Sequence, residues 1–117
     1  MKENVLLESS KKFAVEISLF AKSGEFDRKD DILITQLLRS GTSIGANIYE
    51  GNYAVSKADF INKFQIALKE CYETEYWLEI IKEIGIINLE KYNKFITQCK
   101  KIRKLLTTSL STAKGKL

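Results

Sequence analysis

The feature that most constrains the fold is a set of four stretches in which apolar residues recur every three or four positions, in a chain without proline. This spacing places apolar side chains on one face of a helix, whereas a half-buried strand would alternate apolar and polar residues. Because proline breaks helix interiors, its absence lets each stretch continue as one long helix. The sequence therefore predicts an all-α protein.

Residues that favour helix starts lie between these stretches. Asn88 is a good N-cap residue, and Ser56 and Asp59 have the spacing of a capping box. Asp30 or Asp31 can cap the second helix. We expect helices over residues 3–23, 30–50, 57–84 and 89–112. Short loops between four such helices favour an antiparallel up-down-up-down four-helix bundle, and the chain fits one domain, 1–117.

The second stretch contains an unusual segment, Arg39–Gly51, with three glycines and several small polar residues. A glycine inside a helix costs up to about 1 kcal/mol relative to alanine, so we expect close approach of a neighbouring backbone to compensate. Ser43 lacks a nearby base and would be a poor nucleophile. We interpret the segment as a structural seam that fixes bundle register, with these motif residues: Arg39, Gly41, Ser43, Gly45, Asn47, Glu50 and Gly51.

The absence of histidine excludes Ser-His and Cys-His nucleophile pairs and Cys-His zinc sites. We expect no catalytic residue, no metal ligand and no cofactor, and hence no enzyme. An alternative is a carboxylate-based metal or nucleotide site on the third helix, where Glu70 and Glu73 are three residues apart. No second acidic helix matches them, although a di-metal site needs ligands from several helices. A solvated acidic face is the other interpretation.

Two further features concern the location of the chain. Cys71 and Cys99 lie on apolar helical faces, where we expect reduced, small hydrophobic residues. The first eight residues contain no signal-peptide apolar region, and no apolar run is long enough for a membrane span. We therefore expect a cytoplasmic protein with no membrane partner.

Charge is distributed unevenly along the chain. The net charge is +4, but residues 91–117 carry eight bases and no acid. A basic helix can bind a polyanion, pack against an acidic helix or simply be solvated. If nucleic acid, RNA or DNA, is the partner, binding should be salt-dependent and weakly sequence-specific. The candidate nucleic-acid-binding residues are Lys91, Lys94, Lys100, Lys101, Arg103 and Lys104.

The third helix has a wider apolar surface than one bundle seam needs. Tyr72, Tyr76 and Trp77 lie beside its main apolar stripe. Extra apolar surface of this kind is typical of protein interfaces. We expect these three residues to form an interface between copies of the chain.

Four segments carry a family resemblance: Gln36–Arg39, Ser43–Gly51, Ser56–Phe60 and Phe64–Ala67. They resemble the four-helix bundle proteins encoded within intervening sequences of bacterial 23S ribosomal RNA genes. The chain is also similar to accessory proteins of diversity-generating retroelements. The family motif positions matched here are Arg39, Ser43, Asn47, Glu50, Gly51, Asp59 and Phe60.

The resemblance implies a ring-shaped homo-oligomer, typically a pentamer, often with a basic surface. The retroelement relatives bind nucleic acid and a reverse transcriptase, so both are implied partners. Many members carry an arginine shortly after the Glu-Gly pair, where this chain has Asn52–Ala54. A Gly-Ser-Ala-like stretch is replaced by Lys69–Cys71. We expect a non-enzymatic oligomer that binds nucleic acid through its fourth helix, or alternatively a protein-interaction scaffold that does not.

Overall fold

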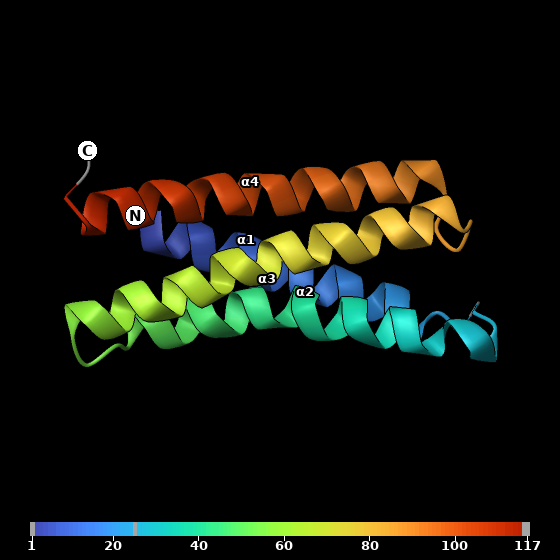
Figure 1. The fold of residues 1–117 in the computed structure, drawn as a ribbon, viewed down its shortest axis with the longest axis horizontal. Helices are drawn as coiled ribbons and strands as arrows, with labels where there is room; N and C mark the ends of the chain where they lie inside the picture. Colours follow the sequence, from blue (N-terminus) through green and yellow to red (C-terminus); the bar gives the residue numbers. More distant parts are fainter. Residues whose placement is uncertain (1, 25, 116–117) are drawn as a thin grey trace.

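The computed structural model describes residues 2–24 and 26–115 and shows an elongated bundle, 46 × 23 × 20 Å (Figure 1). Successive helices run in opposite directions, each packs against the next, and the first also packs against the last. The predicted all-α, up-down-up-down bundle is confirmed. Met1, Glu25, Lys116 and Leu117 of the expected domain lie outside the described residues. The elements are α1 (Lys2–Lys22), the 3₁₀ helix η1 (Arg28–Asp30), α2 (Asp31–Asn52), α3 (Lys57–Glu83) and α4 (Leu89–Ala113).

Local side-chain hydrogen bonds fix the starts of α3 and α4. The Ser56 hydroxyl accepts from the backbone N–H of Asp59 at 3.0 Å, and the Asn88 side chain accepts from that of Lys91 at 2.7 Å. Both predicted caps are confirmed. For α2 the sequence predicts the N-cap position, Asp30, correctly, but not how the helix starts. Asp30 holds the N-cap position in a helical conformation, and its carboxylate accepts no hydrogen bond from the described first turn. The preceding turn η1, which the sequence did not indicate, leads the chain directly into α2.

The core extends along the centre of the bundle and draws on all four helices. Phe13, Ile17 and Phe64 are among its largest fully buried side chains. Two polar groups inside it pair with each other: the hydroxyls of Ser40 and Thr74 form a 3.0 Å hydrogen bond that links α2 to α3. The remaining buried hydrophobic residues are Leu6, Ile34, Leu37, Ile44, Ile48, Ala67, Cys71, Leu78, Ile81, Ile87, Tyr92, Phe95, Ile96, Cys99, Ile102, Leu106 and Leu110.

The two cysteines are free and buried, as expected from their positions on apolar faces. The thiol of Cys99 donates to the backbone carbonyl of Cys71 at 3.5 Å, which joins α4 to α3. Interaction with the Cys71 side chain and burial raise the pKa of Cys99 well above its usual value. Within the described chain, no helix is both long and apolar enough to cross a membrane.

The three glycines of Arg39–Gly51 contact two different helices. An added Cβ would lie 3.3 Å from Ile17 at Gly41 and 3.2 Å from the Ser10 hydroxyl at Gly45, so both glycines face α1. At Gly51 it would lie 2.6 Å from the ring of Phe64 on α3. The expected close approach is therefore present, but side chains rather than a facing backbone make most of it.

The polar residues of the same segment serve mostly their own helix. The Ser43 hydroxyl donates to the carbonyl of Arg39 at 2.7 Å, and the Asn47 amide donates to that of Ser43 at 2.9 Å. Glu50 reaches across to α3, where its carboxylate lies 2.9 Å from Nζ of Lys63. Arg39 also pairs with α3, through Glu73 and Glu70. The cross-helix ion pairs therefore come from the two charged residues at the ends of the segment, and the Ser40–Thr74 hydrogen bond adds a buried link to α3.

Candidate nucleic-acid interface

Two of the six basic residues proposed from the sequence are held by acidic residues of neighbouring helices. Nζ of Lys94 lies 2.9 Å from Glu16 of α1. Nε of Arg103 donates to Glu75 of α3 at 2.7 Å, and its guanidinium carbon lies 4.9 Å from the centre of the Tyr72 ring. These two cations join helices within the fold, so less of their charge is available to an external anion.

The pKa shifts agree with the pairing of Lys94 and Arg103 with carboxylates. The hydrogen bond from Lys94 lowers the pKa of Glu16, and the hydrogen bond to Glu75 raises the pKa of Arg103. Each charged form is thus stabilised by its partner.

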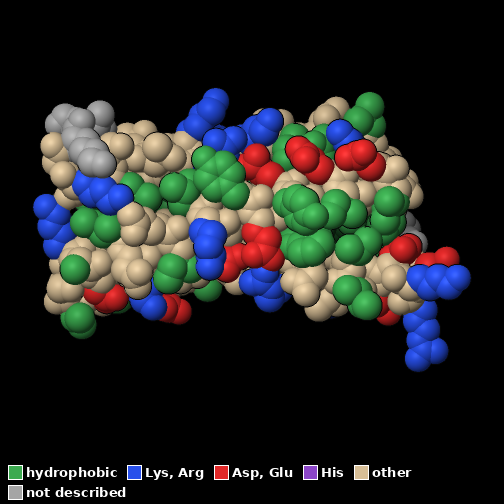
Figure 2. Space-filling model, viewed as in Figure 1, with side chains coloured by type: hydrophobic (Ala, Val, Ile, Leu, Met, Phe, Trp, Pro, Cys, Tyr) green, Lys and Arg blue, Asp and Glu red, His purple; other side chains and the backbone are tan. Residues whose placement is uncertain are grey.

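Lys100, Lys101 and Lys104 of α4 are exposed and lie close together on one helix. None has a carboxylate within ion-pairing distance in the part of the chain that the structure describes. They border a shallow surface depression of approximately 410 Å³, together with Thr97 and Thr108. Basic side chains project from the edge of the molecule formed by α4 in Figure 2. We call these three residues the lysine ridge.

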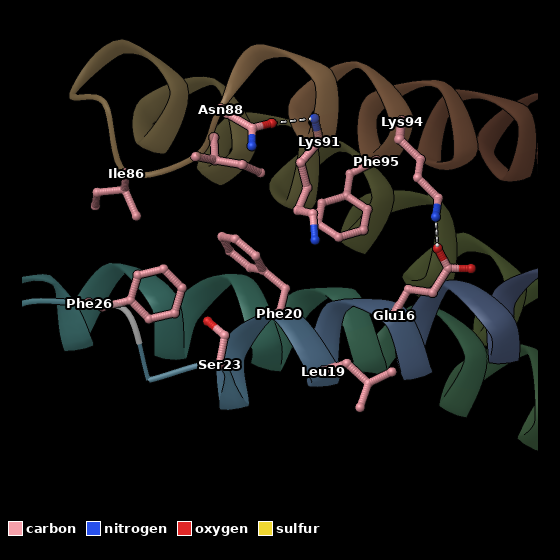
Figure 3. Close-up of a pocket in the computed structure, with 11 residues that line it drawn as sticks. Glu16, Leu19, Phe20, Ser23, Phe26, Ile86, Asn88, Lys91, Lys94 and Phe95 are labelled. Atoms are coloured by element: carbon pink, nitrogen blue, oxygen red, sulfur yellow. Dashed lines mark hydrogen bonds and ion pairs between the residues drawn. The ribbon is translucent and has the colours of Figure 1, made fainter.

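The seam between α1 and α4 continues the basic surface. Lys12 of α1 and Lys101 of α4 line a depression of approximately 210 Å³. Towards the other end of the seam, beyond the Lys94–Glu16 pair, lies a larger pocket of approximately 440 Å³ that includes Lys91 (Figure 3). Nζ of Lys91 lies 5.9 Å from the centre of the Phe20 ring. The six candidates therefore occupy three environments along one helix.

Three acidic residues of α3 lie against arginines. Arg39 binds Glu73 and lies 3.6 Å from Glu70, while Arg103 takes Glu75. Among residues 2–24 and 26–115 there is no group of three or more His, Cys, Asp and Glu placed to hold a metal ion. Glu70 and Glu73, the acidic pair considered for a metal or nucleotide site, thus face Arg39 of α2.

The aromatic residues proposed for self-association lie on the surface of α3. Tyr72 and Tyr76 are 55% and 57% exposed, and Trp77 is half-buried beside Tyr76 with ring centres 5.2 Å apart. The indole N–H of Trp77 donates to Glu73 at 3.0 Å. Apolar side chains form a patch on the face that α3 presents in Figure 2. The three residues are therefore adjacent, with two of the rings accessible.

Sequence reasoning missed the contribution of α1 and of the loops. Lys12 becomes part of the basic surface only because α1 packs beside α4. Phe26 and Ile86 enter the larger pocket from the two loops at one end of the bundle. Asn88 was noted only as a cap, although it also lines this pocket. Local sequence pattern gives no signal for such juxtapositions.

Comparison with known proteins identifies the family. The model of the 23S rRNA-intervening sequence protein family matches residues 2–108. The chain belongs to this family. A crystal structure of a protein of unknown function from the S23 ribosomal protein family of Bacteroides thetaiotaomicron VPI-5482 is similar to it, with a TM-score of 0.90 and 46% identity. The similarity covers 95% of this chain and 99% of that one. No curated protein matches the chain.

Membership of the 23S rRNA-intervening sequence protein family confirms the resemblance that the Ser43–Gly51 segment suggested. The segment contributes packing in this family member, through Gly51 against Phe64, and an inter-helix ion pair through Glu50 and Lys63. The lysine ridge lies elsewhere, on α4. Family membership and fold therefore leave the function to be argued from the surface.

Proposed function

We propose that this protein is a non-enzymatic nucleic-acid-binding protein that contacts the phosphate backbone of RNA or DNA through the lysine ridge. The observation that carries the proposal is the exposure of Lys100, Lys101 and Lys104 beside one shallow depression, without an acidic partner in the described chain. Thr97 and Thr108 add hydroxyl groups at the same depression. Lysine and threonine side chains are common phosphate contacts in protein–nucleic acid complexes.

The number of available cations sets the expected strength of binding. Each phosphate neutralised by lysine releases condensed counterions, so the logarithm of affinity falls by about 0.9 per contact for each unit of log salt on a duplex. Lys94 and Arg103 already pair within the fold and should contribute little. We therefore expect a salt slope of about three for each subunit engaged by the ridge alone.

A mobility-shift titration tests this proposal. The triple variant Lys100→Gln, Lys101→Gln, Lys104→Gln should weaken binding at low salt by at least about tenfold and flatten the salt dependence. The matched control Lys29→Gln, Lys57→Gln, Lys69→Gln removes the same charge from other exposed positions and should change affinity far less. Absence of a shift by the wild-type protein at low salt would refute nucleic-acid binding.

Self-association is part of the same proposal and is supported by the exposed rings on α3. Tyr72 and Tyr76 offer accessible aromatic area next to Trp77, and such residues are enriched at interfaces. The family resemblance suggests a ring of five copies. Sedimentation should give a mass several times the chain's 13.4 kDa, and Tyr76→Glu should lower it. A wild-type monomer at all concentrations would reject the oligomer.

A second candidate is a protein-interaction scaffold that binds no nucleic acid. The engagement of Lys94 and Arg103 by acidic residues favours it, because part of the basic helix already serves packing. A reverse transcriptase is the partner that the resemblance suggests. Under this alternative the mobility shift is absent, while the surface of Tyr72 and Tyr76 is required for complex formation.

A further inference from the structure

A pocket of approximately 440 Å³ lies on the seam between α1 and α4, at one end of the bundle. Three segments build it: the end of α1 with the following loop, the loop between α3 and α4, and the first two turns of α4. Its size lies within the range of small-molecule sites. Figure 3 shows the Phe20 ring projecting between these segments.

The apolar part of the pocket is aromatic. The Phe20 ring meets Phe26 edge-on at 5.0 Å between centres and Phe95 at 5.7 Å. Phe95 is buried, whereas Phe20 and Phe26 are half-buried and keep part of their rings accessible. Accessible aromatic rings can stack with a planar ring, and nucleic-acid bases are bound in this way.

The polar part places charge beside these rings. Lys91 is exposed, and Figure 3 shows its ammonium group reaching towards Phe20. Asn88 uses its carbonyl oxygen to cap α4, which leaves its amide N–H groups as donors at the pocket. Ser23 adds a hydroxyl, and Glu16 adds a carboxylate beside Lys94. A fitting ligand therefore combines a planar ring, hydrogen-bonding edges and a negative charge.

We propose that this pocket binds one unstacked nucleotide, with its base against Phe20 and Phe26 and its phosphate on Lys91. Binding of a nucleotide that belongs to a nucleic-acid strand rests on the proposed function. An apolar ligand would leave Lys91 unused, and a bare anion would leave the rings unused. A nucleotide uses both the ammonium group of Lys91 and the aromatic rings. The chemistry is the same for the terminal nucleotide of a single strand and for a free nucleotide.

The surface between the pocket and the lysine ridge supports the strand as the source. The depression beside Lys12 and Lys101 lies on the same seam and shares Lys101 with the ridge. A strand with its terminal base in the pocket can thus place neighbouring phosphates near these lysines. A duplex cannot do so without unpairing its end, which costs free energy. The site therefore favours single strands over duplexes.

Two measurements test the proposal. In the first, adenosine monophosphate is added in excess to ¹⁵N-labelled protein, and the amide resonances of Ser23, Phe26, Asn88 and Lys91 should shift. In the second, fluorescence anisotropy compares a labelled oligothymidylate strand with a duplex of equal length. The single strand should bind about tenfold more tightly, because it adds one stacked base.

The variants separate the pocket from the ridge. Phe26→Ala and Lys91→Gln should each abolish the nucleotide-induced shifts and reduce the preference for single strands. Lys91 is exposed, so its variant should fold even if the loop around Phe26 is disturbed. Lys100→Gln should weaken single strand and duplex equally and leave the shifts unchanged.

The outcomes distinguish this inference from the proposed function. If binding is salt-dependent but equal for single strand and duplex, and no resonance shifts, the proposed nucleotide site in the pocket is wrong. The proposed phosphate contacts of the lysine ridge are then still supported. Absence of all oligonucleotide binding overturns the proposed function. In that case, shifts with adenosine monophosphate alone identify a free-nucleotide site, and their absence overturns the pocket as well.

Discussion

Gly51 of α2 lies against the ring of Phe64 of α3 so closely that an added Cβ would be 2.6 Å from Cε1. Phe64 is 1% exposed and is enclosed by the core, so its ring has little room to move. This contact lies near the turn that joins the two helices. It sets how closely α2 and α3 approach there.

We expect Gly51→Ala to lower the free energy of unfolding by about 1–3 kcal/mol, because overpacking exceeds the gain in helix propensity of about 1 kcal/mol. Urea unfolding followed by circular dichroism measures this. Gly45→Ala is the matched control, since its Cβ would meet the Ser10 hydroxyl at 3.2 Å and a small shift relieves the contact. Equal losses in the two variants would contradict the role of Phe64.

Arg103 and Lys101 should separate stability from binding on one helix. Arg103→Met leaves the largely buried carboxylate of Glu75 without its partner, and we expect a loss of about 1–3 kcal/mol in unfolding free energy. Its nucleic-acid affinity should change little. Lys101→Met should show the reverse, with nearly unchanged stability and weaker binding at low salt. Similar binding losses in both variants would show that Arg103 also contacts the ligand.

Stability should decrease at acidic pH because two carboxylates have lowered pKa values. Glu16 is lowered mainly by its hydrogen bond with Lys94, and Glu73 by its hydrogen bond with Trp77. Their contribution is fully present above the unfolded-state pKa of about 4.3. It is lost as the pH falls through the lower folded values. Urea midpoints measured from neutral to acidic pH should be level and then fall.

Trp77→Phe tests the larger cause of the Glu73 shift. This variant removes the indole N–H but keeps an aromatic ring, so the pKa of Glu73 should rise towards its usual value while Arg39 still lowers it. The acid-dependent loss of stability should then be smaller than in the wild type. The pH dependence of the urea midpoint measures the difference. An unchanged profile would assign the shift to Arg39 alone.

The two thiols should be inert in the folded protein. Both cysteines are buried, and the raised pKa of Cys99 suppresses its reactive thiolate. Iodoacetamide labelling followed by mass spectrometry should give no adduct in native buffer and two in urea, one for each cysteine. Rapid native labelling would show that the seam between α3 and α4 opens.

The features that sequence predicted well are local ones. The caps at Ser56 and Asn88 depend on residues three positions apart, and the apolar stripes depend on one helix period. Thr74 was missed because a polar residue breaks the apolar pattern, although its hydroxyl is paired inside the core with Ser40. Phe95 was missed because α4 buries a wider face than one stripe.

The site was predicted only in part because its residues come from different helices. Nothing near Arg103 in the sequence indicates that Glu75 will lie opposite it, since this depends on how α3 and α4 align. The same holds for Lys94 and Glu16, which are far apart in the chain. The pocket around Phe20 combines α1, two loops and α4, so no single segment could indicate it.

The packing at Gly51 also bears on how the chain folds. Two pairs of residues meet near the α2–α3 turn: Gly51 with Phe64, and Glu50 with Lys63. The members of each pair are close in sequence, and Ser56 between them caps the start of α3. Bringing them together closes only a short loop, which costs little chain entropy. The pair of helices can therefore form before α1 and α4 arrive. We expect this hairpin to be the nucleus of folding, with the seam between the first and last helices completed late.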